Sequence, residues 1–104
     1  MSITNELTNQ IIDHIYRAGG YAWRSSSTGI YDTKRQFFRA ASKKGVADIL
    51  ACWKGRLVAI EVKTGKDRLS PEQTGFLFNI NHAGGIGFVA RDFNNFLDQW
   101  EKIA

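Results

Sequence analysis

The stretch that decides the fold is VADILACWKGRLVAIEV, residues 46–62. It consists of two apolar runs, 46–53 and 56–62, separated by Lys54-Gly55. A two-residue connection that contains glycine between two such runs is typical of a β-hairpin. Because both runs are apolar on both faces, we expect this hairpin at the centre of a sheet that is covered on each side.

The length of the turn also predicts which residues of the two strands face each other. If Lys54 and Gly55 form the turn, Trp53 faces Arg56 and, counting back along both strands, Asp48 faces Glu61. Residues that face each other in this way have Cβ atoms about 5 Å apart and point to the same side of the sheet. Lys63, two residues after Glu61, points to that side as well. The hairpin therefore brings two carboxylates and an amine together.

Two carboxylates held this close on central strands repel each other unless a proton or a cation lies between them. Carboxylate oxygens suit Mg²⁺ or Mn²⁺, which keep open positions for water and phosphate oxygens. Such an ion lowers the pKa of bound water and stabilises charge on a phosphodiester, and Lys63 can orient that water or neutralise that charge. The alternative is structural: Glu61 and Lys63 form a surface ion pair on an edge strand, and Asp48 is a turn residue.

On the N-terminal side of the hairpin, apolar residues at helical spacing predict a helix over residues 3–18. Thr4 is expected to cap its start, and Gly19-Gly20 to end it. Residues 21–24 read as a short strand. Residues 25–44 have no clear period and are typical of a long surface loop or a poorly ordered segment.

On the C-terminal side, Ser70-Pro71-Glu72-Gln73 predicts a helix start, with Ser70 and Gln73 as a capping box and proline in the first turn. A strand over 86–90 and a final helix capped by Asp92 complete the chain. The predicted order is helix, strand, hairpin, helix, strand, helix, or α-β-β-β-α-β-α. We therefore expect an α/β fold with a mixed β-sheet flanked by helices.

Length and composition favour one folded domain over residues 1–104, because 43% of the residues are hydrophobic and 23% are charged. No apolar segment is long enough to span a bilayer, and the first residues do not resemble a signal peptide. The single cysteine, Cys52, cannot form an internal disulfide and is expected to be a small core residue. We expect a cytoplasmic protein, in the host cell if the source is a virus.

The charge of the chain favours an anionic partner such as DNA. Fourteen lysines and arginines stand against ten acidic residues, a formal net charge of +4. Five of the basic residues fall in one stretch that contains no acid: Lys34, Arg35, Arg39, Lys43 and Lys44. We predict that this stretch contacts DNA phosphates; the alternative is a solvated loop.

Several motifs, taken in order, resemble the VRR-NUC domain of the PD-(D/E)xK nuclease superfamily. They are KGVADIL (44–50), KGR (54–56), EVKT (61–64), LSPEQ (69–73) and GG (84–85). The resemblance spans nearly the whole chain. The protein therefore looks like a stand-alone, virus-type member of the family, such as those of phages. One departure is Ala47, because the family often has proline before the aspartate.

The resemblance implies a restriction-endonuclease-like fold and an endonuclease that depends on Mg²⁺ or Mn²⁺. It also implies a preference for branched or structured DNA such as Holliday junctions, and a homodimer. By motif, Asp48 and Glu61 are metal ligands, the carbonyl of Val62 is a further ligand, and Lys63 is the catalytic lysine. Two alternatives stay open: a non-catalytic DNA-binding module, and a nuclease acting on simple duplex or single-stranded DNA.

Two further residues are assigned to the site by the resemblance. Glu6 matches a glutamate that family members place on the first helix at the edge of the site, as a catalytic residue and metal ligand; the alternative is that it only favours the positive end of the helix. Gln73 matches the glutamine that ends the family motif, and its capping role can coexist with a role at the site. His14 is expected to be structural. The three tryptophans are expected to be core or interface anchors rather than platforms for bases: Trp23, Trp53 and Trp100.

Overall fold

The computed structural model describes residues 2–25, 30–32, 37–39 and 45–104. Its centre is a four-stranded sheet in the order β1-β4-β5-β6, in which only the β5–β6 pair is parallel. The strands are β1 (Tyr21–Arg24), β4 (Ile49–Trp53), β5 (Arg56–Val62) and β6 (Ile86–Ala90). The predicted mixed sheet is thus confirmed, and the hairpin strands β4 and β5 are its two central strands.

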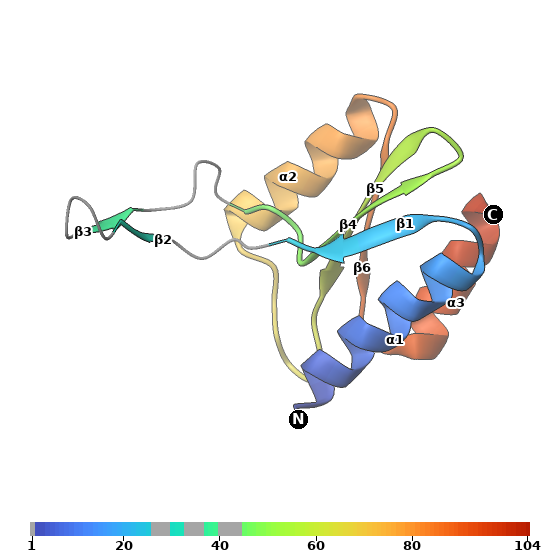
Figure 1. Ribbon diagram of the computed structural model, residues 1–104, viewed down its shortest axis with the longest axis horizontal. Coiled ribbons are helices and arrows are strands. Elements are labelled where there is room, and N and C mark those ends of the chain that lie inside the picture. The colour runs from blue at the N-terminus through green and yellow to red at the C-terminus, as the bar shows by residue number, and fades with distance from the viewer. Residues whose placement is uncertain (1, 26–29, 33–36, 40–44) are drawn as a thin grey trace.

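Helices cover both faces of this sheet (Figure 1). Helices α1 (Ile3–Arg17) and α3 (Phe93–Ile103) lie on one face, and α2 (Pro71–His82) lies on the other. The predicted order α-β-β-β-α-β-α is confirmed for these elements. None of the helices in the described part of the chain is long and apolar enough to cross a membrane.

Residues 25–44 differ from the expected loop, because they contain a second, two-stranded antiparallel sheet. It consists of β2 (Ile30–Asp32) and β3 (Phe37–Arg39), and among the described elements these strands pack only on each other. Each contains β-branched or aromatic residues, which favour strands. Three residues are too few to produce the alternation by which a strand is recognised in a sequence.

The β4–β5 hairpin has the predicted register, with Trp53 opposite Arg56 and Ile49 opposite Ile60. The φ angles of Lys54 and Gly55 are 49° and 78°. Positive φ at both central residues is what a tight two-residue turn needs to match the twist of the strands. The turn therefore fixes the pairing of the two strands up to the point where Asp48 precedes β4.

The main core lies between the sheet and the helices α1 and α3. Phe96 and Trp100 of α3 pack there with Ile11 and Ile15 of α1 and with the β4 and β5 side chains that point to this face. His14 packs edge-on against the rings of three core residues, as its expected structural role requires: Phe93, Phe96 and Trp100. Trp53 also belongs to this core, with its ring 5.1 Å from that of Trp100.

The opposite face of the sheet is only partly covered. Helix α2 packs Leu77 on Ala47 and Ala59, next to β6. Cys52 and Leu57, which pair with each other nearer the turn, are exposed. The expectations that Cys52 is a core residue and that the whole hairpin is covered on both sides are therefore wrong, because none of the described helices lies over this end of the face.

The helix ends follow the expected capping rules with one exception. Ser70 and Gln73 form the predicted capping box, and Asp92 caps α3 by accepting a hydrogen bond from the Asn95 amide. Helix α1 is capped by Ser2 and not by Thr4. The helix starts two residues earlier than a Thr4 cap would allow, and the Thr4 hydroxyl instead hydrogen-bonds the Thr64 hydroxyl at 2.8 Å.

Candidate active site

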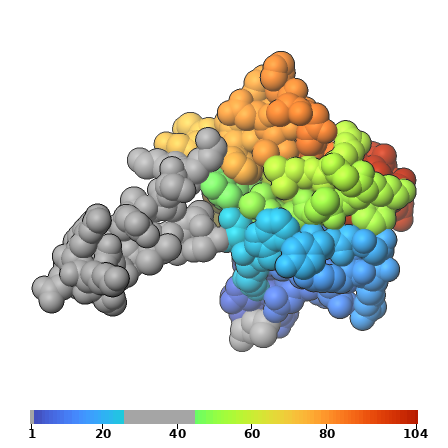
Figure 2. Space-filling view, turned by 45° about the horizontal axis from the view of Figure 1, so that its top comes forward, coloured from blue at the N-terminus to red at the C-terminus, as the bar shows by residue number. Residues whose placement is uncertain are grey.

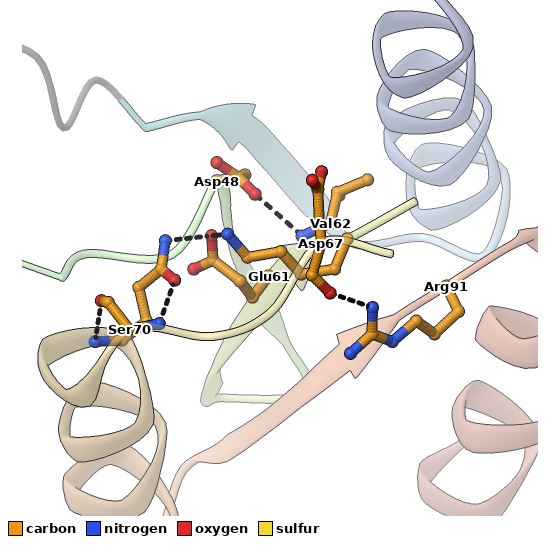
Figure 3. A network of polar contacts seen from close by, with 8 residues as sticks. Asp48, Glu61, Val62, Asp67, Ser70 and Arg91 are labelled. Atoms are coloured by element: carbon orange, nitrogen blue, oxygen red, sulfur yellow. Dashed lines mark hydrogen bonds and ion pairs between the residues drawn. The ribbon is translucent and has the colours of Figure 1, made fainter. Parts of the chain in front are cut away.

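Asp48 and Glu61 come together at the end of the hairpin away from its turn. Asp48 directly precedes β4 and Glu61 lies in β5, so the strand register places them opposite each other. The Val62 amide donates a hydrogen bond to Asp48 Oδ2 at 2.8 Å, which ties this carboxylate to the neighbouring strand (Figure 3). The predicted juxtaposition of the two carboxylates is therefore observed.

Glu61 is a charged residue inside the sheet, with only 1% of its surface exposed. Its Oε1 accepts a hydrogen bond from Gln73 Nε2 at 3.0 Å and lies 4.0 Å from the Lys63 ammonium. Its Oε2 is buried and has no hydrogen-bond partner among the described residues. A buried carboxylate oxygen without a partner is energetically unfavourable, so this position suits a proton or a cation.

The surroundings of Glu61 strongly favour its protonated form when no cation is present. Burial raises the pKa of Glu61 from 4.5 to about 8, and the neighbouring Asp48 carboxylate raises it further, because it favours a proton shared between the two groups and repels a second negative charge. The Lys63 ammonium opposes these effects but is outweighed. Near neutral pH the metal-free pair therefore holds a proton that a cation would have to displace.

Gln73 links the carboxylate pair to the first turn of α2. Its Oε1 accepts a hydrogen bond from the Ser70 amide at 2.9 Å, and its own amide donates to Ser70 Oγ at 3.1 Å. Since the carbonyl end is held by the cap, the NH₂ end is directed to Glu61. Gln73 thus combines the capping contact and the site contact, and Ser70 fixes its orientation.

Gly45 brings the first turn of α2 close to the chain that leads into Asp48. A Cβ at Gly45 would lie 2.4 Å from the Glu72 carbonyl oxygen and 2.9 Å from the Gln73 nitrogen, and its φ is +78°. Only glycine permits this backbone contact. From the sequence, Gly45 is only part of a motif, and its close contact with α2 is not predicted. The signal that could have indicated it is a glycine beside a strand that does not belong to the hairpin turn, because such a glycine often marks a close backbone contact.

Glu6 is not brought into the carboxylate pair. It lines a cavity of about 260 Å³ together with Thr64, Gly65 and Arg91, beside the segment that follows Lys63. Among the described residues, no three His, Cys, Asp or Glu side chains group closely enough to hold a metal ion. Glu6 therefore lies outside any such group among the described residues, and its role as a catalytic residue and metal ligand at the edge of the site stays a prediction.

The predicted DNA-contacting residues cannot be placed around the site. Lys34, Arg35, Lys43 and Lys44 lie outside the described residues, and for Arg39 only the backbone, at the end of β3, is described. Trp23, expected in the core or in an interface, is 41% exposed. It lies in β1, opposite Leu50 of β4.

The donor set fits a hard divalent cation. Two carboxylates stand side by side, one with an unpartnered buried oxygen, and Mg²⁺ or Mn²⁺ is bound in proteins by one or two carboxylates together with water. In a strand the N–H and C=O of one residue point to the same neighbouring strand. Because the Val62 N–H points to Asp48, its carbonyl is directed to the same side.

The fold has a counterpart among solved structures. No protein-family model matches the chain, and no curated protein matches it in sequence. The structure is similar to that of Hjc, a Holliday junction resolvase from the archaeal hyperthermophile Archaeoglobus fulgidus, with a TM-score of 0.58 and 22% identity over 85% of this chain and 67% of that one. The two proteins share a fold, which confirms the predicted restriction-endonuclease-like mixed β-sheet flanked by helices.

Proposed function

We propose that this protein is a metal-dependent DNA endonuclease that hydrolyses phosphodiester bonds. The observation that carries the proposal is the buried Glu61, which lies beside Asp48 and within 4.0 Å of Lys63 and whose Oε2 has no hydrogen-bond partner in the described part of the chain. A merely structural ion pair does not explain this arrangement, because it would leave neither an unpartnered oxygen nor a second carboxylate in place.

Mg²⁺ or Mn²⁺ would be held by the carboxylates of Asp48 and Glu61 and by the Val62 carbonyl. When bound, such an ion supplies Lewis-acid stabilisation of the phosphodiester and lowers the pKa of a water molecule. Glu61 must give up its proton to take part, and the hydrogen bond from Gln73 then keeps its carboxylate in a fixed orientation. The hydrogen bond from the Val62 amide likewise keeps the Asp48 carboxylate in a fixed orientation.

Lys63 is proposed as the catalytic amine. It points to the same face of the sheet as Glu61, and its side chain is 16% exposed, so its ammonium is close to the carboxylates and still open to a substrate. A cation in this position neutralises negative charge that develops on the phosphate, or orients the attacking water. Replacing Lys63 should therefore reduce the rate more than it reduces DNA binding.

We propose branched DNA as the preferred substrate and a homodimer as the active form. The resolvase of similar fold is named for the Holliday junction, which agrees with the resemblance of the motifs to VRR-NUC nucleases. The described part of one chain contains one candidate site, the pair Asp48 and Glu61, whereas resolving a four-way junction takes two symmetric cuts. Two copies related by a twofold axis would provide them.

The proposal is tested by incubating the purified protein with a four-way junction and with linear duplex, in Mn²⁺, Mg²⁺ or EDTA. The protein should cut with either metal and not in EDTA, and the junction should be the better substrate. Glu61→Gln and Lys63→Ala should lower the rate by at least about a hundredfold. Glu72→Gln, which changes an exposed glutamate on α2, is the matched control and should cut normally. Binding to DNA without any cutting would favour a non-catalytic DNA-binding module.

A further inference from the structure

Three aromatic side chains form an exposed strip beside the carboxylate pair. Tyr16, at the end of α1, is 47% exposed, and Tyr21 and Trp23, both in β1, are 62% and 41% exposed. Their rings touch in sequence: the Tyr16 and Tyr21 centroids are 5.9 Å apart, and those of Tyr21 and Trp23 are 5.5 Å apart. We refer to these three residues as the aromatic strip.

The pairing of β1 with β4 places Tyr21 and Trp23 on the same face of the sheet as the site. The Ser25 amide donates to the Asp48 carbonyl at 2.9 Å, Trp23 faces Leu50, and Tyr21 faces Cys52. Facing residues share a side of the sheet, and each step of two residues along a strand covers about 6.7 Å. The aromatic strip therefore starts one such step from the row of Asp48 and runs away from it.

The face that carries the aromatic strip is open. Helix α2 covers the β5 and β6 side of this face, whereas Cys52 and Leu57, which continue the row of Tyr21 across the sheet, are exposed. In Figure 2 the side chains of β1 and of the β4–β5 hairpin form one surface between α2 above and α1 below. Large exposed aromatic residues in one continuous patch mark a binding surface.

The segments around the aromatic strip carry little negative charge, which suits an anionic partner. Of the nearby cations, Arg17 on α1 is exposed at the outer end of the aromatic strip. The cations of the hairpin turn belong to the other side of the sheet: Lys54 lies over the ring of Trp53, a residue of the main core, and Arg56 donates to the Gly84 carbonyl. The acids in segments 13–25 and 48–57 are Asp13, which is paired with Arg17 at 3.0 Å, and Asp48, which belongs to the site. A nucleic acid strand along this face would therefore meet no unpaired acid of these two segments before it reached the proposed metal site.

We propose that the aromatic strip stacks unpaired bases that flank the phosphate bound at Asp48 and Glu61. The proposal rests on the function proposed above and adds a substrate class: DNA with unpaired nucleotides next to the cut. Exposed aromatic rings bind bases by stacking, whatever the base. Bases inside a duplex already stack on their neighbours, so only unpaired bases can present their faces to Tyr21 and Trp23.

The test compares the binding of a labelled duplex with a single-stranded tail and of the same duplex with blunt ends, by fluorescence anisotropy in EDTA. Trp23→Ala should weaken binding of the tailed DNA by about tenfold and leave the blunt duplex nearly unchanged. Trp23→Phe keeps a ring and should retain most of the affinity. Phe78→Ala is the matched control, because Phe78 is 65% exposed on α2, away from the aromatic strip, and should bind both DNAs like wild type.

A change in the DNA tests the same proposal without altering the protein. Replacing the tail bases by abasic sites should weaken wild-type binding as much as Trp23→Ala does, and should have no further effect on that variant. Equal losses for Trp23→Ala and Phe78→Ala, or equal losses on tailed and blunt DNA, would overturn the proposal. So would a wild-type dimer that Trp23→Ala converts to a monomer in analytical ultracentrifugation, since the aromatic strip would then be a subunit interface.

The outcomes separate this proposal from the proposed nuclease activity. If the protein cleaves DNA in Mn²⁺ but its DNA binding does not depend on the tail bases, only the role of the aromatic strip is refuted. Base-dependent binding without cleavage in any metal refutes only the nuclease.

Discussion

Glu61 is the residue on which the interpretation depends, and much of its setting could be predicted. A charge that interrupts a buried run is rare without a function, and the two-residue turn places it opposite Asp48. The sequence could not reveal that Oε2 would lack a partner among the described residues or that Gln73 would donate to Oε1. Those contacts depend on how closely α2 approaches the sheet, which is a property of tertiary packing.

The raised pKa of Glu61 predicts how stability depends on pH in EDTA. Because its pKa is about 8 in the folded protein and 4.5 ordinarily, the folded state binds the proton more tightly. The contribution of this proton to the free energy of unfolding is fully present below pH 4.5. It is lost as the pH rises to about 8, by at most ~1.4 kcal/mol per pH unit. Urea unfolding at several pH values measures this slope.

Two comparisons isolate the contribution of Glu61. Glu61→Gln cannot ionise and should flatten the loss of stability between pH 5 and pH 8, whereas the exposed control Glu72→Gln should keep it. Mn²⁺ should stabilise the wild type more at pH 8 than at pH 6, because it binds the deprotonated pair. An identical pH slope in wild type and Glu61→Gln would show that another group is responsible.

Gln73→Glu separates the capping role of this residue from its role at the site. A glutamate can still accept the hydrogen bond from the Ser70 amide, but it has no NH₂ group to donate and places a third negative charge beside Glu61. We expect stability within about 1 kcal/mol of wild type at pH 5, with DNA cleavage at least about tenfold slower and shifted to higher pH. Asn79→Asp, which adds a charge at an exposed position of α2, should leave the pH profile unchanged.

At the scale of elements, the predictions succeeded where the signal is local. The hairpin turn, the capping box of α2 and the cap of α3 depend on residues a few positions apart, and all three are confirmed. The errors concern contacts between elements. The spacing predicts a cap at Thr4, but its hydroxyl bonds Thr64. The apolar neighbours of Cys52 predict a core position, but no described helix covers it.

The contact between Gly45 and α2 should matter for both stability and cleavage. Gly45→Ala combines a positive φ with a clash against the backbone of Glu72 and Gln73. Gly55 has the same φ of +78°, but a Cβ added there would have no described atom within 4 Å apart from its chain neighbours. Gly55→Ala is therefore a matched control for the φ angle alone, which costs roughly 1–2 kcal/mol. Gly45→Ala should destabilise the protein more than Gly55→Ala in urea unfolding.

The rate of DNA cleavage per folded molecule shows whether Gly45→Ala displaces Gln73 or only destabilises the protein, and Gly55→Ala is again the control. Per folded molecule, Gly45→Ala should cut more slowly than wild type because Gln73 is displaced from Glu61, and Gly55→Ala should cut at the wild-type rate. Equal effects of the two variants on both quantities would mean that the backbone contact has no part in placing Gln73.

At the scale of the whole molecule, the fold was predictable and the assembly was not. The order of the elements and a mixed sheet follow from patterns within one chain, and the similarity to the resolvase confirms that fold. The homodimer stays a prediction, because a subunit interface leaves no periodic pattern in a sequence. The contact of the basic residues in 34–44 with DNA phosphates stays a prediction as well.

If the active form is a dimer, mixing wild type with an excess of Glu61→Gln should change the products and not only the rate. Mixed dimers have one working site, so nicked junctions should accumulate at the expense of junctions cut on both strands. A gel that resolves the two products measures the ratio. A ratio that does not change with the amount of Glu61→Gln would indicate that each chain cuts independently.

The most direct test of the central claim is calorimetric titration of the protein with Mn²⁺ near pH 7, in two buffers with different ionisation enthalpies. Wild type and Glu72→Gln should bind Mn²⁺ with release of a proton, since the pKa of Glu61 is about 8. Glu61→Gln should bind at least about tenfold more weakly and release no proton. Equal Mn²⁺ affinity and equal proton release in wild type and Glu61→Gln would contradict the claim that Asp48 and Glu61 form the metal site.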